Sequence, residues 1–206
     1  MKKIMFSDKF GLTEAVQTGR KTVTRRIVPK EAEIDALTYC TARGLGEKDI
    51  KEYILRQAPY KVGDIIAVCM SYEHIYEKYV LDEELIYQFW NMYRDTPGWN
   101  NKMFVKAEEC PVRIRITGVC AERLQDISDE DCLKEGVFKY DEKLLCDVID
   151  LYNPWPPYVK PYKLDRDNLR YRCSARSAFS ILIDKINGRG TWKKNPLVYR
   201  YEFHVL

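Results

Sequence analysis

The stretch that decides the fold is residues 19–28, which read Gly19-Arg20-Lys21-Thr22-Val23-Thr24-Arg25-Arg26-Ile27-Val28. This tract is basic and rich in β-branched residues, which predicts a strand that Pro29 closes. The preceding residues 10–18 place apolar side chains on one helical face, and Gly19 supplies a left-handed turn to end that helix. Because strand residues three apart point to opposite faces, Lys21 and Thr24 share a site only if Lys21 lies in the turn.

Outward from this tract, short apolar runs alternate with helical patterns. Strands are predicted at 4–6, 65–68, 103–107, 112–119 and 197–205. A capping box at Ser128 and a stop at Gly136 predict a short helix with Glu135 in its last turn, and an amphipathic helix is predicted at 175–186. We interpret three further segments as insertions: helical residues 31–57 and 73–94, and the proline-rich residues 138–172. The predicted fold class is α+β, one domain over residues 1–206 that forms a small mixed β-barrel with helical insertions.

The composition excludes several classes of protein. In 206 residues, 34 lysines and arginines nearly balance 31 aspartates and glutamates. The net charge of +3 excludes a protein that coats nucleic acid through a broad positive field. No apolar run approaches the roughly 18 to 20 residues of a membrane helix, and the N-terminal residues are too charged for a signal peptide. We therefore expect a soluble, cytoplasmic protein.

Metal and cofactor chemistry has little support in the sequence. The seven cysteines are scattered without a C-x-x-C pair, and His74 and His204 are the only histidines. The tract 19–28 lacks the second glycine and the Lys-Ser/Thr pair of a phosphate loop. We therefore expect no metal, no cofactor, and cysteines that are reduced and structural.

The basic tract has two interpretations. As a charged run it is an exposed strand, with Arg20, Arg25 and Arg26 available to bind phosphate. As a catalytic segment it combines a hydroxyl group with a base, because Thr24 is a weak nucleophile unless Lys21 takes its proton. Crowding by the arginines would lower the pKa of that lysine from about 10.4 and favour the free amine.

Three more residues are candidates for the same site. Glu135 lies where the negative end of its helix disfavours a carboxylate, the direction that an acid catalyst needs, and a solvated helix-end glutamate is the alternative. Trp192 and Tyr199 are candidates to stack on a nucleobase, and ordinary burial in the core is the alternative for both.

The pattern Gly19-x-Lys21-x-x-Thr24-x-Arg26 resembles the signature of the ASCH domain family, whose fold is a PUA-like β-barrel. Further segments resemble this family in the same order along the chain: residues 60–64, residues 124–128 with Glu135-Gly136, and residues 198–203. Residues 5–7, 98–104 and 190–192 resemble an enlarged, prophage-associated subgroup. The matching segments cover about half of the chain, and the three predicted insertions lie outside the small family members.

The resemblance also implies an activity. One branch of the family consists of small amidohydrolases that cleave 4-acetylcytidine to cytidine and acetate. By position, their nucleophilic threonine falls on Thr24, the lysine that accepts its proton on Lys21, and the glutamate that protonates the leaving amine on Glu135. The residues predicted to bind substrate or RNA are Arg20, Arg25, Arg26, Trp192 and Tyr199.

Two functions remain open at this point, with a modified nucleoside or RNA as the partner. The first is a metal-independent amidohydrolase acting on an acylated nucleoside or base, which requires Lys21, Thr24 and Glu135 to converge. The second is a non-catalytic module that binds RNA or a modified base. It requires one outward basic stripe beside an exposed aromatic side chain, made of Lys21, Arg25, Arg26, Arg113 and Arg115.

Overall fold

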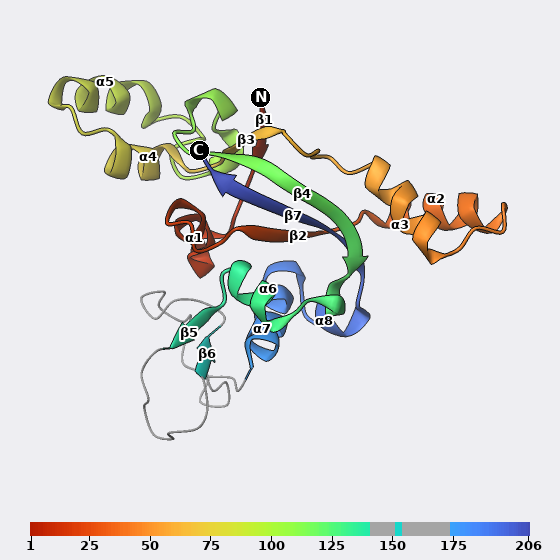
Figure 1. Ribbon diagram of the computed structural model, residues 1–206. Coiled ribbons are helices and arrows are strands. Elements are labelled where there is room, and N and C mark those ends of the chain that lie inside the picture. Colours follow the sequence, from red (N-terminus) through yellow and green to blue (C-terminus); the bar gives the residue numbers. More distant parts are fainter. Residues whose placement is uncertain (141–150, 154–173) are drawn as a thin grey trace.

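A five-stranded sheet organises the molecule (Figure 1). The structure is a computed structural model that describes residues 1–140, 151–153 and 174–206. The strand order across the sheet is β1 (Lys2–Ile4), β3 (Ile65–Val68), β4 (Arg113–Arg123), β7 (Leu197–Val205) and β2 (Val23–Ile27). The β1–β3 pair is parallel and the other pairs are antiparallel, so the sheet is mixed. The predicted α+β class is confirmed.

The predicted closure of this sheet into a barrel is wrong. A barrel needs a backbone ladder that continues around the whole circumference. In the part of the chain that the structure describes, β1 and β2 are the two edges of the sheet and do not pair with each other. A side chain joins the two edges instead, because Arg26 donates a hydrogen bond from Nη2 to the carbonyl oxygen of Met5 at 2.6 Å.

The two longest strands, β4 and β7, form the curved centre of the sheet (Figure 1). In the first half of β4, Ile114 and Ile116 are buried whereas Arg113 and Arg115 are exposed, as the alternation predicts. The β4–β7 register shifts between Ile116 and Gly118, which marks a β-bulge.

The helices are α1 (Leu12–Gln17), α2 (Lys30–Thr41), α3 (Glu47–Arg56), α4 (Tyr72–Tyr79), α5 (Glu83–Tyr93), α6 (Asp129–Lys134), α7 (Ala175–Asn187) and α8 (Thr191–Lys194). In Figure 1, α4 and α5 project near the C-terminal end of β7, and α2 and α3 project on the other side of the view. Helices α6, α7 and α8 lie together below β2, and α1 lies beside the start of β2. The segments predicted as helical at 31–57 and 73–94 are therefore two helix pairs, α2–α3 and α4–α5.

Residues 103–107 do not form the predicted strand. Two 3-10 turns, Lys102–Phe104 and Ala107–Glu109, occupy this region. The side chain of Asn101 accepts a hydrogen bond from the backbone amide of Met103, so local bonds satisfy the backbone there without a partner strand.

The predicted proline-rich insertion at 138–172 lies mostly outside the described residues. Its described parts are two short strands, β5 (Phe138–Tyr140) and β6 (Leu151–Asn153), which pair antiparallel.

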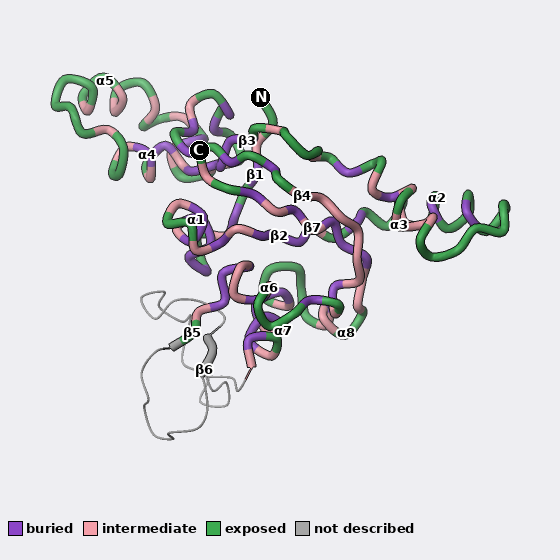
Figure 2. The backbone as a smooth tube through the Cα atoms, in the orientation of Figure 1, coloured by how far each residue is buried: buried purple, intermediate pink, exposed green. Residues whose placement is uncertain are grey.

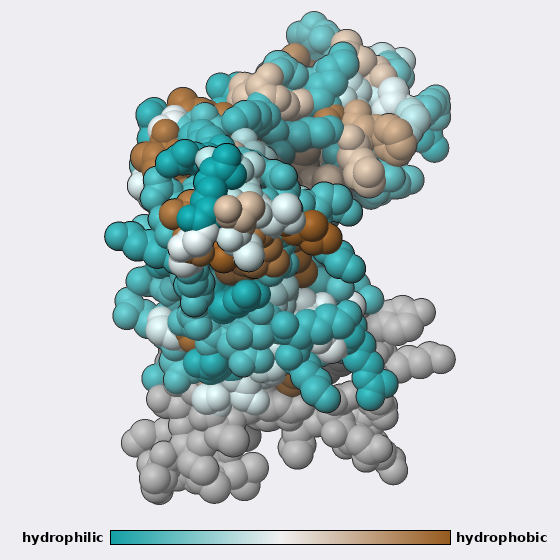
Figure 3. All heavy atoms as spheres, turned by 90° about the vertical axis from the view of Figure 1, so that its right-hand side faces the viewer, coloured by the Kyte–Doolittle hydropathy of each residue, from teal (hydrophilic) through white to brown (hydrophobic). Residues whose placement is uncertain are grey.

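The buried residues concentrate on the central strands and on the helix faces that meet them, whereas the two projecting helix pairs are largely exposed (Figure 2). Seen from the side of α2 and α3, the surface is mostly hydrophilic with separate apolar patches (Figure 3). No helix in the described residues is long and apolar enough to cross a membrane. The cysteines that the structure describes are free thiols: Cys40, Cys69, Cys110, Cys120 and Cys132.

Candidate functional site

The turn between α1 and β2 sets the position of Lys21. Gly19 has a φ of +72°, the left-handed conformation that ends α1, and the amide of Lys21 donates to the carbonyl oxygen of Ala15 at 2.7 Å. Regular strand structure begins only at Val23. Lys21 therefore lies in the turn, as the prediction requires.

Three hydrogen bonds from consecutive residues hold this turn against the end of α6. The guanidinium of Arg20 donates to the carbonyl oxygen of Gly136 at 2.6 Å, and the amide of Thr22 donates to that of Lys134 at 3.0 Å. Between them, Lys21 Nζ donates to the carbonyl oxygen of Glu135 at 2.7 Å. Residues 20, 21 and 22 therefore contact residues 136, 135 and 134 respectively, so the two segments run in opposite directions. This pairing fixes Lys21 opposite Glu135.

The side chains of Lys21 and Glu135 form a buried ion pair. Nζ of Lys21 lies 2.5 Å from Oε2 of Glu135, and the two side chains are 2% and 6% exposed. The ammonium also donates to the carbonyl oxygen of Val23 at 2.8 Å. Burial lowers the pKa of Lys21 from its ordinary value of 10.5, against the opposing attraction of Glu135, and the charges of Arg26 and Arg25 lower it further. The structure therefore brings two residues of the predicted triad together across 114 positions of sequence.

The position of Glu135 follows from the local sequence of α6. The Ser128 side chain caps the helix by accepting from the amide of Asp131, and Glu135 is the residue that ends it. The next residue, Gly136, has a φ of +105°, and a Cβ there would lie 3.0 Å from a methyl carbon of Leu12. Only glycine lets the chain turn this closely under α1.

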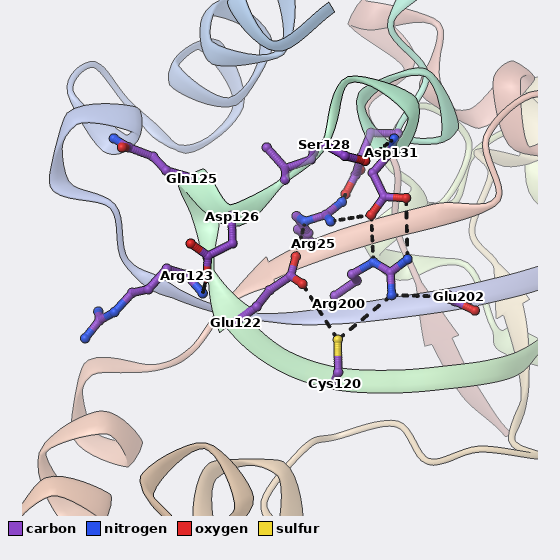
Figure 4. Close-up of polar contacts among 12 residues, drawn as sticks. Arg25, Cys120, Glu122, Arg123, Gln125, Asp126, Ser128, Asp131, Arg200 and Glu202 are labelled. Carbon is purple, nitrogen blue, oxygen red and sulfur yellow. Dashed lines mark hydrogen bonds and ion pairs between the residues drawn. The ribbon is translucent and has the colours of Figure 1, made fainter. Parts of the chain in front are cut away.

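Arg25 connects β2 with β4 and α6 through three carboxylates, of which Figure 4 labels Glu122 and Asp131. Its side chain is 1% exposed and donates from Nε to Glu122 at 2.7 Å, from Nη2 to Asp131 at 2.8 Å and from Nη1 to Glu135 at 3.2 Å. Arg200 on β7 donates to the same Asp131 at 3.0 Å. We call Arg25, Glu122, Asp131 and Arg200 the carboxylate cluster.

Asp131 receives the two arginines of this cluster. Burial opposes its ionisation, but hydrogen bonds from Arg25 and Arg200 outweigh that effect and lower the pKa of its carboxyl group. Asp131 and Glu130 both lie in the first turn of α6, where acidic side chains stabilise a helix. Glu130 does pair within the helix, with Lys134, whereas Asp131 points at the sheet. The strand register that brings Arg25 opposite Arg200 carries no local sequence signal.

Thr24 lies on the other face of β2 from Arg25, because successive strand residues alternate. Its direct neighbour across the β2–β7 pair is Tyr201, and the residue is 4% exposed. Among the residues that the structure describes, the Thr24 hydroxyl makes no hydrogen bond, to Lys21 and Glu135 included. Next to Thr24, Lys21 contacts only the backbone. Its Nζ donates to the carbonyl oxygen of Val23, which belongs to the peptide bond between Val23 and Thr24.

Arg26 lies on the Thr24 face of the sheet. Its Nη2 donates to Met5, and its guanidinium carbon lies 5.4 Å from the centre of the Phe6 ring, while Lys21 Nζ lies 5.7 Å from the same ring. Within the described residues Arg26 makes no ion pair, and its Nε is buried without a hydrogen-bond partner. Arg26 thus differs from its neighbour Arg25, which binds three carboxylates.

The two predicted stacking residues are not open platforms. Tyr199 is 2% exposed and lies opposite Arg26 in the β2–β7 pair. Trp192 is half-buried, with its ring edge-to-face on Phe179 at 6.1 Å. A stacking role for either residue stays a prediction.

The outward basic stripe that the RNA-binding alternative requires does not form. Lys21 and Arg25 are buried and paired with carboxylates, whereas Arg113 and Arg115 are exposed on β4. The described residues also hold no group of three or more histidine, cysteine, aspartate or glutamate side chains placed to bind a metal ion.

No protein-family model, no curated protein and no solved structure matches this chain, so the resemblance to the ASCH family stays a prediction.

Proposed function

We propose that this protein is a member of the ASCH family that hydrolyses the exocyclic amide of an acylated nucleoside or base such as 4-acetylcytidine. The observation that carries the proposal is the buried contact of Lys21 with Glu135, 2.5 Å between Nζ and Oε2. Burial of an isolated amine is costly, and a lysine this deep in a fold is common where its proton is needed.

The contact allows Lys21 to act as the general base and Glu135 as the general acid. Moving one proton from Lys21 to Glu135 converts the ion pair into a neutral amine and a carboxylic acid, and burial of Lys21 favours its neutral amine. The amine is then the general base and the carboxylic acid the general acid. One proton transfer between these two side chains therefore forms both the general base and the general acid, and no proton from solvent is needed.

Thr24 is the nucleophile in this mechanism. Lys21 takes the proton of its hydroxyl as the oxygen attacks the acyl carbon, and Glu135 protonates the amine nitrogen as the carbon–nitrogen bond breaks. Water then cleaves the acyl ester on Thr24 and releases acetate. The hydroxyl is free for this role, because it makes no hydrogen bond within the described part of the chain, and Lys21 binds the peptide directly before it.

The test is release of cytidine from 4-acetylcytidine by the purified protein, followed by chromatography. Thr24→Val keeps the shape of the side chain without its hydroxyl and should abolish nearly all turnover, as should Lys21→Met, because nucleophile and base act as a unit. Thr24→Ser keeps a hydroxyl and is the matched control. Glu135→Gln should slow this amide more than an ester analogue, whose leaving group needs protonation less.

The pH dependence gives a second reading of the same assay. The reactive pair holds one proton, shared between Lys21 and Glu135, so kcat/KM should fall as the pH rises through the pKa of Lys21 and this proton is lost. Since burial lowers that pKa, the fall should occur below 10.5, the ordinary value for lysine. Undiminished release by Thr24→Val, or no release by the wild type, would refute the mechanism and leave the non-catalytic RNA- or modified-base-binding module as the better account.

A further inference from the structure

Two buried hydrogen-bond donors without partners belong to residues on the same face of the sheet as Thr24. They are the hydroxyl group of Tyr201 and Nε of Arg26, and neither has a hydrogen-bond partner among the described residues. Buried polar groups are almost always paired, because an unpaired one loses its hydration without compensation. Two such groups on one face of the sheet indicate a site that a ligand completes.

The β2–β7 register puts both donors on the Thr24 face of the sheet. Thr24 pairs with Tyr201 and Arg26 pairs with Tyr199, and side chains directly opposite each other in antiparallel strands share a face. Arg26 and Tyr201 are also near enough that each side chain acts on the ionisation of the other.

Other contacts hold the two donors in place. The ring of Tyr60 lies edge-to-face on that of Tyr201 at 5.3 Å, and its own hydroxyl donates to the carbonyl oxygen of Lys3 at 2.9 Å. Arg26 is anchored at its far end by the bond to Met5. Burial raises the pKa of Tyr201, so the phenol keeps its proton and is a donor at neutral pH.

We propose that the Tyr201 hydroxyl and Arg26 Nε form the oxyanion hole of this site, holding the acyl oxygen of the substrate beside Thr24. The inference rests on the proposed function, whose three residues provide a nucleophile, a base and an acid but no group for the charge on that oxygen. As the Thr24 oxygen bonds to the acyl carbon, the electron pair of the carbonyl double bond moves to its oxygen, which accepts from both donors. The pair returns when the carbon–nitrogen bond breaks, and the amine takes the proton of Glu135. Fixed donors aimed at such developing charge are a large source of rate enhancement.

Tyr201→Phe removes one donor and leaves the ring, so it is the sharpest test. We expect kcat for 4-acetylcytidine to fall about 100- to 1000-fold with little change in KM, the range seen when one oxyanion-hole donor is removed. Arg26→Lys keeps a positive charge without Nε and should lower kcat by a similar factor. Tyr72→Phe is the matched control, since Tyr72 is also a buried tyrosine but its hydroxyl bonds Glu109, away from β2.

Thermal unfolding gives a readout that does not depend on turnover. The Tm of Tyr201→Phe without substrate should equal or exceed that of the wild type, because no hydrogen bond is lost, whereas Tyr72→Phe should lower it. A fall in Tm for Tyr201→Phe as large as that for Tyr72→Phe would show that the hydroxyl already has a partner and would overturn the inference.

The outcomes separate this inference from the proposed function. If the wild type hydrolyses 4-acetylcytidine and Tyr201→Phe keeps its kcat, the oxyanion hole is overturned and the proposed function stands. If the wild type binds 4-acetylcytidine without cleaving it, seen as a rise in Tm that Tyr201→Phe loses and Tyr72→Phe keeps, the donor pair stands as a binding site and the proposed hydrolysis fails. Neither binding nor cleavage by the wild type overturns both.

Discussion

Adjacent arginines with opposite surroundings define the site at the scale of single residues. Arg25 is enclosed by Glu122, Asp131 and Glu135, whereas Arg26 meets a carbonyl oxygen and an aromatic ring. Removing a buried partner leaves the other charges uncompensated, which typically costs about 3–5 kcal/mol, whereas an exposed pair contributes about 0–1 kcal/mol. Arg25→Ala should therefore lower the free energy of unfolding in urea by about 3 kcal/mol or more.

The exposed pair of Arg56 with Glu52 supplies the matched control, and Arg56→Ala should cost well under about 1 kcal/mol. The pH dependence gives the sign of the effect. Because Arg25 and Arg200 hold the pKa of Asp131 below its ordinary 3.8, the stabilisation is present above that pH and is lost as the pH falls through the folded-state pKa. The wild-type and Arg25→Ala curves should converge in acid, and a constant difference down to about pH 2 would contradict this origin.

At the scale of elements, the sequence predicts what local signals determine. The turn at Gly19, the cap at Ser128 and the stop at Gly136 are all found, because backbone conformation and capping depend on a few neighbouring residues. The partners of Arg25 could not be predicted, because they depend on strand register between distant segments. The prediction of barrel closure was wrong for the same reason, because no local sequence pattern shows whether two edge strands pair with each other.

Gly98 packs against the Tyr72 ring at the base of the α4–α5 helix pair, where no side chain fits. A Cβ on Gly98 would lie 2.4 Å from a ring carbon of Tyr72, whose ring stacks on Tyr93 at 4.1 Å and whose hydroxyl bonds Glu109. Gly98→Ala should therefore displace the Tyr72 ring and destabilise the protein by about 1–3 kcal/mol, the usual range for overpacking. Urea unfolding and limited proteolysis of α4–α5 would measure this.

Gly46 provides the control at a helix start. A Cβ there would have only Asp49 Oδ2 nearby, at 4.0 Å. Gly46→Ala should therefore change the free energy of unfolding by about 0.5 kcal/mol. Equal stability of Gly98→Ala and Gly46→Ala would show that Tyr72 yields without cost and that the helix pair is held by other contacts.

At the scale of the whole molecule, charge decides which partners are compatible with the fold. The net charge is +3, and the buried Lys21 and Arg25 are neutralised inside, so neither adds to an outward field. The exposed Arg113 and Arg115 remain on β4. A neutral nucleoside needs no electrostatic attraction to enter a site, whereas an RNA chain depends on it.

We therefore expect weak, non-specific binding to RNA. A labelled single strand should bind no more tightly than about 10⁻⁶ M at physiological salt, with affinity that falls further as salt rises, because each phosphate contact releases counterions. Replacing both Arg113 and Arg115 by alanine should weaken this binding, and Arg26→Ala should leave it unchanged because Arg26 faces Met5 and Phe6. Fluorescence anisotropy at about 50 mM and about 200 mM salt would measure both effects. Nanomolar binding that Arg26→Ala abolishes for all sequences alike would instead identify the tract after Gly19 as an RNA-contacting surface, and the amidohydrolase proposal would then give way to the binding module.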